Sequence, residues 1–372
     1  MEQLKYFDYA ATTPIDESVY EVYRATGEEC FFNSGCNKLA KELETYARTL
    51  IMESLDLDQT KHDLVFTSGG TESNNLAILG FAKTLTKSAH FITSCFEHAS
   101  VNSCFVELEN AGHSVTYIPV DSKGHINISD VIDSINDDTV MISIMLVNNE
   151  LGTRQPIEEL FEIVKRDHSH IVTMTDYVQG LGKLAFDHTN VDLFTISSHK
   201  IYGPKGVGAL LKTKSTPLRP LLVGGTNEGN MRAGLQSLPA QVAFAASVKK
   251  VVDNFEANNR KIAEVQEHFH ALVDQSPVLT LNCKPQGNVS SIRLDSKEEN
   301  DEILEMMENE GFFLSARSAD SAGIKLYSRS LLGIGLTHEQ IDRSMRVSFS
   351  HHTTVTDVEE LVSTLENVIK SN

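Results

Sequence analysis

The sequence lacks several features, and each absence excludes a class of protein. Its 372 residues include no tryptophan and only five cysteines, at positions 30, 36, 95, 104 and 283, which form no C-x-x-C pair. An odd number of cysteines without paired spacing predicts neither a disulfide framework nor a structural zinc site, and it fits a reducing compartment. No uninterrupted apolar run approaches the length of about 18 residues that a membrane span requires, so we expect no such span.

Positive charge is also scarce. Lysine and arginine number 32 against 51 aspartate and glutamate residues, which gives a formal net charge of -19. Such a surface repels phosphate backbones and anionic lipids, so we expect neither a direct nucleic-acid partner nor a membrane partner. The opening residues, MEQLKYFDYAATT, lack the basic stretch and apolar core of a secretory signal. We therefore expect a cytoplasmic protein.

Short apolar runs are the dominant feature that is present. They carry many β-branched residues and are separated by amphipathic stretches; the runs are DLVFTS, AHFITSC, SVTYIPV, TVMISIMLV, HIVTMTD, DLFTISS and VGALLK. Strands that alternate with helices in this way are typical of a mainly parallel sheet covered by helices on both faces. The predicted fold class is therefore α/β.

A long helical pattern over residues 238–275 divides the chain. Apolar residues recur there at helical spacing, which predicts one long helix or a bent pair joining two lobes. The residues beyond it predict a smaller α+β unit, with strands in LTLNC, NVSSIRL and SMRVSFS. We expect an N-terminal segment, 1–15, that packs near the ligand site and the small domain, a large domain, 16–250, and a small C-terminal domain, 251–372.

Two predicted strand ends carry residues suited to ligand binding, which in open α/β sheets occurs at the carboxyl ends of strands. In VFTSGGTESNNLAI, the N–H groups around Gly70 and Thr71 open a helix and favour a bound phosphate, although an ordinary glycine turn explains them equally well. In HIVTMTDYVQG, the carboxylate of Asp176 follows a buried strand and needs a cation or several donors, with a helix cap as the alternative.

A third strand end carries Lys200, in TISSHKIYGPKGVGAL. A lysine in a desolvated site has a lowered pKa and forms a Schiff base with a carbonyl group, whereas a lone lysine often extends to solvent. The glycines behind it match neither a P-loop nor a Rossmann fingerprint, which disfavours nucleotides. Together, a phosphate cradle, a buried carboxylate and a strand-end lysine are the parts needed to hold pyridoxal phosphate.

The stretch SSHKIYGPKGVGAL, together with YFDYAATTP, FTSGGTESNN, EHASV, VNNELGTRQPI and TDYVQGLGK, closely resembles the cysteine desulfurases of the NifS and IscS type. These belong to the class V aminotransferase family of fold-type I pyridoxal phosphate enzymes, and the resemblance extends from Tyr6 to the C-terminal helix. It implies a large domain with a mainly parallel sheet, a smaller α+β domain, a homodimer and a role in sulfur metabolism, including iron–sulfur cluster assembly.

The resemblance also implies a set of site residues. In the matching motifs, Lys200 forms the Schiff base, and His98 stacks on the cofactor ring and assists proton transfer; these are the expected catalytic residues. The expected cofactor contacts are the phosphate ligands Gly70, Thr71, Ser197 and His199, the ring-nitrogen partner Asp176, and Asn149 and Gln179 near the phenolic oxygen and the substrate.

The substrate side departs from the family pattern. In LSARSADSAG, Asp320 occupies the position of the family's persulfide-forming cysteine, and a carboxylate is no substitute for a thiolate nucleophile. In MRVSFSHHTT, Arg346 remains, whereas His351 replaces a later arginine expected to grip the substrate carboxylate. Leu235 replaces a threonine that reaches the partner subunit's phosphate.

We therefore expect a pyridoxal phosphate-dependent enzyme of the cysteine desulfurase family that acts on L-cysteine or a related small amino acid. A sulfur-acceptor protein is a candidate partner. Two alternatives stay open: a β-lyase or aminotransferase-like enzyme without persulfide chemistry, and a non-catalytic sulfur-relay paralogue. Asp320, Arg346 and His351 are the residues on which the choice depends.

Overall fold

The computed structural model describes residues 5–30, 37–316 and 327–371. A seven-stranded sheet lies at its centre, in the order β2-β8-β7-β6-β5-β3-β4. Its strands are β2 (His62–Thr67), β3 (His90–Ser94), β4 (Ser114–Ile118), β5 (Thr139–Ser143), β6 (Val172–Asp176), β7 (Leu193–Ser197) and β8 (Gly208–Thr213). Only β8 runs antiparallel to its neighbours within this sheet. The predicted mainly parallel α/β sheet is confirmed.

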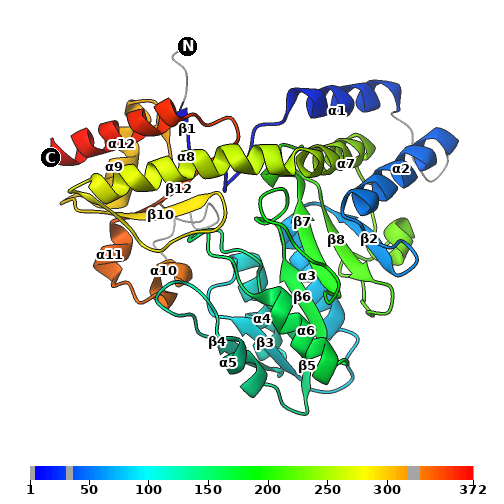
Figure 1. Ribbon diagram of the computed structural model, residues 1–372. Coiled ribbons are helices and arrows are strands. Elements are labelled where there is room, and N and C mark those ends of the chain that lie inside the picture. Colours follow the sequence, from blue (N-terminus) through cyan, green and yellow to red (C-terminus); the bar gives the residue numbers. More distant parts are fainter. Residues whose placement is uncertain (1–4, 31–36, 317–326, 372) are drawn as a thin grey trace.

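Helices cover both faces of this sheet (Figure 1). Along β2, Leu64 and Phe66 pack into one apolar cluster and Val65 into another, on the opposite face. The first cluster includes residues of α2 (Lys38–Ser54), α5 (Ile128–Asp133), α6 (Ile157–Asp167) and α7 (Leu238–Asp253), and α1 (Glu17–Glu29) packs on α7; the second includes residues of α3 (Gly70–Ala82) and α4 (Ala99–Asn110). Because both faces are covered, most residues of β3, β5, β6, β7 and β8 are buried.

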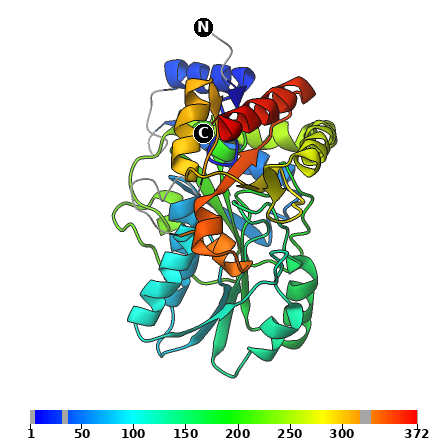
Figure 2. The same ribbon diagram turned by 90° about the vertical axis from the view of Figure 1, so that its left-hand side faces the viewer.

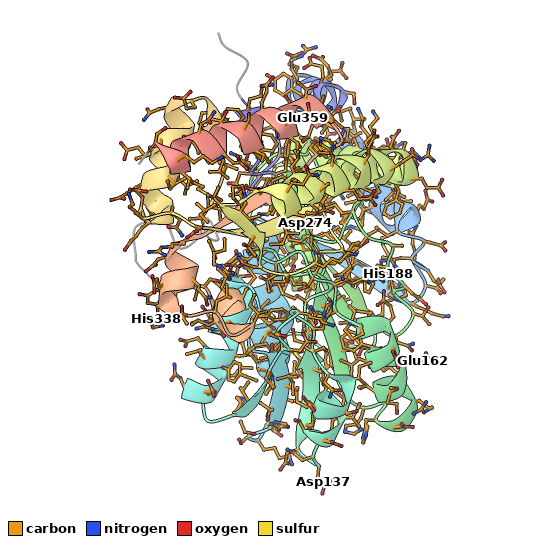
Figure 3. All side chains as sticks on the ribbon, turned by 60° about the vertical axis from the view of Figure 1, so that its left-hand side comes forward. Asp137, Glu162, His188, Asp274, His338 and Glu359 are labelled. Carbon is orange, nitrogen blue, oxygen red and sulfur yellow. The ribbon has the colours of Figure 1, made fainter. Side chains whose placement is uncertain are left out.

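The helical pattern over 238–275 forms a bent pair, α7 and α8 (Phe255–Gln275), which meet at Asn254. A separate apolar cluster lies between α8 and an antiparallel sheet of order β12-β10-β9. Its elements are β9 (Leu279–Leu281), β10 (Val289–Leu294), α9 (Asn300–Asn309), β12 (Ser344–Ser348) and α12 (Val355–Lys370). Helix α12, on which Figure 3 labels Glu359, packs along α8. His268 Nε2 of α8 lies 3.1 Å from Glu359 Oε1. This separate cluster supports the domain boundary that we propose near residue 250.

Two short helices, α10 (Arg329–Gly333) and α11 (His338–Asp342), complete the C-terminal unit. This unit lies above the large sheet in Figure 2. Leu331 and Ile341 of these helices pack with Phe96 and Met145, which follow strands of the large sheet. Nowhere in the described part of the chain is a helix long and apolar enough to cross a membrane.

The N-terminal segment contacts both units. Its strand β1 (Lys5–Tyr6) pairs in parallel with β11 (Phe312–Phe313) of the C-terminal unit, and the Ala10 N–H donates to Ser348 Oγ at 2.9 Å. On the other side, the Thr13 N–H donates to the His199 carbonyl at 2.8 Å, directly after β7. These contacts support our proposal that the segment packs between the ligand site and the small domain.

A buried glutamate joins the carboxyl ends of two central strands. The hydroxyl of Ser94 and the N–H of Met145 both donate to Glu97 Oε1, the latter at 3.0 Å. Glu97 Oε2 is buried and has no hydrogen-bond partner among the described residues, and the whole side chain is 4% exposed. Burial raises the pKa of this carboxyl to about 8. This raised pKa favours the protonated acid at neutral pH.

We expect Glu97→Gln to change how stability depends on pH. The folded-state pKa lies above the unfolded one, so the neutral carboxyl contributes stability that is complete below about pH 4.5 and is lost as pH rises to about 8, at roughly 1.4 kcal/mol per pH unit. Glutamine does not titrate. As pH rises through this range, the free energy of unfolding of Glu97→Gln, measured by urea denaturation, should therefore increase relative to that of the wild type.

The matched control is Glu107→Gln, on the exposed side of α4. The difference in free energy of unfolding between Glu107→Gln and the wild type should vary much less with pH over the same range. A Glu97→Gln difference that is constant from pH 5 to pH 8 would show that Glu97 is ionised in the folded protein.

Candidate active site

A single cavity of about 500 Å³ brings most of the expected site residues together. It lies at the carboxyl ends of β2, β6 and β7, where an open α/β sheet binds its ligands. The expected residues that line it are Gly70, Thr71, His98, Asn149, Asp176, Gln179, Ser197, His199, Lys200 and Arg346. His351 is not among its lining residues, and Asp320 lies outside the described residues.

One end of the cavity is a tight turn between β2 and α3. Gly69 there has a φ of 152°, which favours glycine, and a Cβ on Gly208 would lie 2.7 Å from the Gly69 Cα. The turn opens the N-terminus of α3 at Gly70, whose N–H groups favour an anion. Beside it, the buried Ser197 Oγ has no hydrogen-bond partner in the described structure. An unpaired hydroxyl beside a helix N-terminus fits a phosphate group.

Lys200 ends a short 3₁₀ turn, Ser198–Lys200, directly after β7. Its Nζ donates to the carbonyl oxygens of Ala10 and Ala11, at 2.6 and 2.7 Å. These carbonyls belong to the N-terminal segment, which therefore forms one wall of the cavity. The side chain points into the protein, so the alternative of a lysine extended into solvent is wrong.

Asp176 is 7% exposed at the end of β6. Its Oδ1 accepts the N–H of Val178 at 2.9 Å, and its Oδ2 accepts a hydrogen bond from Asn74 Nδ2 at 2.9 Å. The first bond caps a turn, whereas the second holds the carboxylate in the cavity wall. The cap interpretation is thus partly right, and the position of the carboxylate in the cavity wall fits the proposed partner of a pyridine nitrogen.

His98 is the N-cap of α4 and lines the cavity. The ring Nδ1 accepts the N–H of Ser100 at 3.2 Å and lies 2.8 Å from Ser100 Oγ. Since the Nδ1 edge faces α4, the ring is held rigidly where it lines the cavity.

The structure separates the two residues expected on the substrate side. Arg346 is 3% exposed and lines the cavity; its Nη2 donates to Asp8 Oδ1 at 2.8 Å and its Nη1 to the carbonyl of Asn149 at 3.1 Å. His351 instead packs on the ring of Tyr202, with centroids 4.9 Å apart. The geometry therefore suits Arg346 for binding a carboxylate and gives no support to the expectation for position 351.

Residues in and beside the cavity escaped the sequence reasoning; Asn74 lines it, whereas Lys183 contacts a lining residue from outside. Asn74 lies one helical turn after Gly70, a spacing that places it on a predictable face of α3. Lys183 donates to Gln179 Oε1 at 3.2 Å, and the Gln179 amide donates to the Ala10 carbonyl at 2.8 Å. Burial, together with the charges of Lys200 and Arg346, lowers the pKa of Lys183 to about 7. No spacing rule in the sequence signals such contacts between distant segments.

Comparison with known proteins finds matches that extend over nearly the whole chain. The family model for aminotransferase class-V matches residues 5–361. A protein of Dictyoglomus turgidum named cysteine desulfurase IscS is 35% identical over 380 residues, covering 100% of this chain and 95% of the relative. One from Methanosarcina thermophila with the same name is 33% identical over 374 residues, covering 98% and 92%.

Solved structures with a similar fold also cover most or all of the chain. A NifS-like protein superposes with a TM-score of 0.92 at 26% identity, over 100% of both chains. A protein named SspA, solved in complex with cysteine, gives a TM-score of 0.80 at 31% identity, over 94% of this chain and 100% of that one. The chain thus belongs to the class-V aminotransferase family, as a pyridoxal phosphate-dependent enzyme of the IscS and NifS cysteine desulfurase type.

Proposed function

We propose that this enzyme binds L-cysteine or a related small amino acid, removes its α-proton through Lys200, and transfers sulfur only slowly. The observation that carries the proposal is the presence of a buried arginine and a strand-end lysine in one cavity beside a phosphate-binding turn. When bound, pyridoxal phosphate supplies an electron sink for the charge left by the departing proton. The residues of the chain would bind the cofactor and the substrate and would accept the α-proton.

The cofactor contacts divide among three structural elements. The N-terminus of α3 at Gly70 and the unpaired Ser197 hydroxyl would hold the phosphate. Asp176, oriented by Asn74, would keep the ring nitrogen protonated. The Lys200 amine, held by the carbonyls of Ala10 and Ala11, would be directed toward the substrate carbon and act as the base.

Arg346 would bind the substrate carboxylate. Asp8 and Asn149 orient its guanidinium group, and its Nε is buried without a hydrogen-bond partner among the residues described. A buried N–H without an acceptor is costly, and a carboxylate would satisfy it. The complex of SspA with cysteine supports an amino acid of this size.

The residue that would accept the sulfur atom is where this sequence departs most from the family pattern. A thiol acceptor takes the sulfur of cysteine and leaves alanine, so that cysteine and R–SH give alanine and R–S–SH. Here the acceptor position holds Asp320. Of the four described cysteines, none lines the cavity, and burial raises the pKa of Cys283 and of Cys104 to about 12. We propose that loss of the loop thiol, rather than loss of the cofactor site, limits sulfur transfer.

Two alternatives predict other products. A β-lyase converts cysteine and water to pyruvate, ammonia and hydrogen sulfide, whereas a non-catalytic paralogue forms none of these. Tight orientation of Lys200 and Arg346 in one cavity favours a catalytic protein over the paralogue. A sulfur-acceptor protein and a cytoplasmic location remain part of our proposal.

We also propose a homodimer. Val223 and Leu235 are 81% and 73% exposed in the segment 221–236, which the Arg232–Glu72 ion pair ties to the cavity at 2.9 Å. Exposed apolar side chains of this extent beside a ligand site mark an interface. Leu235 would supply apolar contact there but no hydroxyl for the partner's phosphate.

The first test of function is exchange of the substrate α-proton. Wild-type protein loaded with pyridoxal phosphate should exchange the α-proton of L-cysteine in D₂O, followed by mass spectrometry, and should form alanine slowly. Lys200→Ala should lose exchange by a factor of 10² or more, roughly the contribution of a general base. The control Lys123→Ala, at an exposed turn, should exchange like the wild type. Wild-type protein that exchanges nothing, or that forms pyruvate as its main product, would refute the proposal.

A second test concerns the carboxylate. Arg346→Lys should weaken cysteine binding roughly 10- to 100-fold, the factor for one charge-assisted hydrogen bond, measured as the dissociation constant from the cofactor absorbance. His351→Ala should change it little. Cysteamine, which lacks a carboxylate, should bind the wild type and Arg346→Lys about equally. If His351→Ala greatly weakened cysteine binding and Arg346→Lys did not, position 351 rather than Arg346 would be the site that binds the carboxylate.

A third test restores the nucleophile. Asp320→Cys should raise the rate of alanine formation from cysteine at least about tenfold, because a thiolate attacks sulfur and a carboxylate does not. Asp320→Ser is the matched control, since it removes the negative charge without adding a thiol. Equal rates in the two variants would show that charge, rather than the missing thiol, limits the wild type.

A further inference from the structure

A chain of buried hydrogen bonds joins His98 to Asp176 through Ser100 and Asn74. Asn74 Nδ2 lies 2.9 Å from Asp176 Oδ2 and 2.9 Å from Ser100 Oγ, which in turn lies 2.8 Å from His98 Nδ1. Asn74 and Ser100 are 1% and 8% exposed. Separately, Asn74 orients Asp176 and Ser100 holds the His98 ring; the bond between Asn74 and Ser100 connects these two functions.

The direction of each bond at Asn74 follows from its partners. A carboxylate only accepts, so the group facing Asp176 must be the Asn74 NH₂. On the other side, the hydroxyl of Thr195 donates to Asn74 Oδ1 at 2.8 Å. Both contacts require the same orientation of the Asn74 amide group, which could otherwise be reversed.

The orientation of the amide then determines the proton on the histidine. Because Asn74 donates to Ser100 Oγ, the hydroxyl proton of Ser100 points to His98 Nδ1. The backbone N–H of Ser100 also donates to Nδ1, at 3.2 Å. A ring nitrogen that accepts from two donors carries no proton of its own, so the neutral ring carries its proton on Nε2.

We propose that Asn74 and Ser100 are positioning residues that hold His98 as the Nε2–H tautomer and orient Asp176 through the same amide. An amide does not relay protons, so the chain fixes orientation rather than conducting a proton. His98 then acts through Nε2 as a hydrogen-bond donor, and the removal of the substrate α-proton falls to Lys200. This assignment of roles rests on the proposed function, whereas the tautomer does not.

The tautomer is measured directly by ¹⁵N NMR of histidine-labelled protein, with and without pyridoxal phosphate, and His98→Gln identifies the His98 signals. Wild-type protein should show the proton on Nε2. Ser100→Ala should lower the ratio of Nε2–H to Nδ1–H tautomer about fivefold, the factor that one neutral hydrogen bond corresponds to. Ser100→Thr, which keeps the hydroxyl, should restore it, and Ser103→Ala, exposed on the same helix, should have no effect.

Asn74→Ala provides an independent variant, because loss of the amide donor frees the Ser100 hydroxyl to rotate and should shift the ratio in the same direction. A proton on Nδ1 in the wild type would overturn the inference, as would identical ratios in Ser100→Ala and Ser103→Ala. Because the NMR measurement needs no turnover, its failure is distinguishable from failure of the proposed reaction. A tautomer as expected together with an α-proton that Lys200→Ala still exchanges would retain the positioning role and refute the proposed function.

Discussion

The buried guanidinium group of Arg346 is the constraint on which the assembly of the site depends. A charged side chain that is 3% exposed is tolerated only when it is paired, and its partners come from two distant parts of the chain, Asp8 and Asn149. Arg346 itself belongs to β12 of the C-terminal sheet. One cation therefore links the N-terminal segment, the large domain and the small domain at the wall of the cavity. Removal of any partner would leave charge without compensation.

The same wall concentrates positive charge in a protein whose formal net charge is -19. Lys200 and Lys205 line the cavity with Arg346, and Lys183 lies next to Gln179 behind it. The lowered pKa of Lys183 is the cost of this arrangement, since burial and two neighbouring cations disfavour its charged form. A phosphate and a substrate carboxylate would both relieve that repulsion. The cationic side chains in this cavity thus favour small anions in a protein whose charge is otherwise negative.

The sequence revealed the strands because most of them are buried, β4 at the sheet edge being the exception, and it pointed to the candidate cofactor residues because they follow strand ends. Helices α1, α2, α10 and α11 were not predicted; α10 and α11 have five residues each, too few for a periodic pattern, whereas α2 does bury apolar residues at helical spacing and was overlooked. The expectation for His351 failed for a local reason: it lies three residues beyond the end of β12, where the chain turns toward Tyr202. Asn74 and Ser100 were missed because the bond between them joins different helices, and no local spacing encodes that contact.

Proton removal and sulfur transfer make different demands, and this chain meets them unequally. Removing an α-proton needs a base, an electron sink and a bound substrate carboxylate; in our proposal Lys200 is the base, the cofactor is the sink and Arg346 holds the carboxylate. Moving a sulfur atom additionally needs a thiolate that reaches the substrate. We propose that Asp320 takes the place of that thiolate; the hydrogen bonds that hold Lys200, Asp176 and Arg346 come from other parts of the chain, at Ala10, Asn74 and Asp8. The cavity can therefore keep its proton chemistry while the group that accepts sulfur changes.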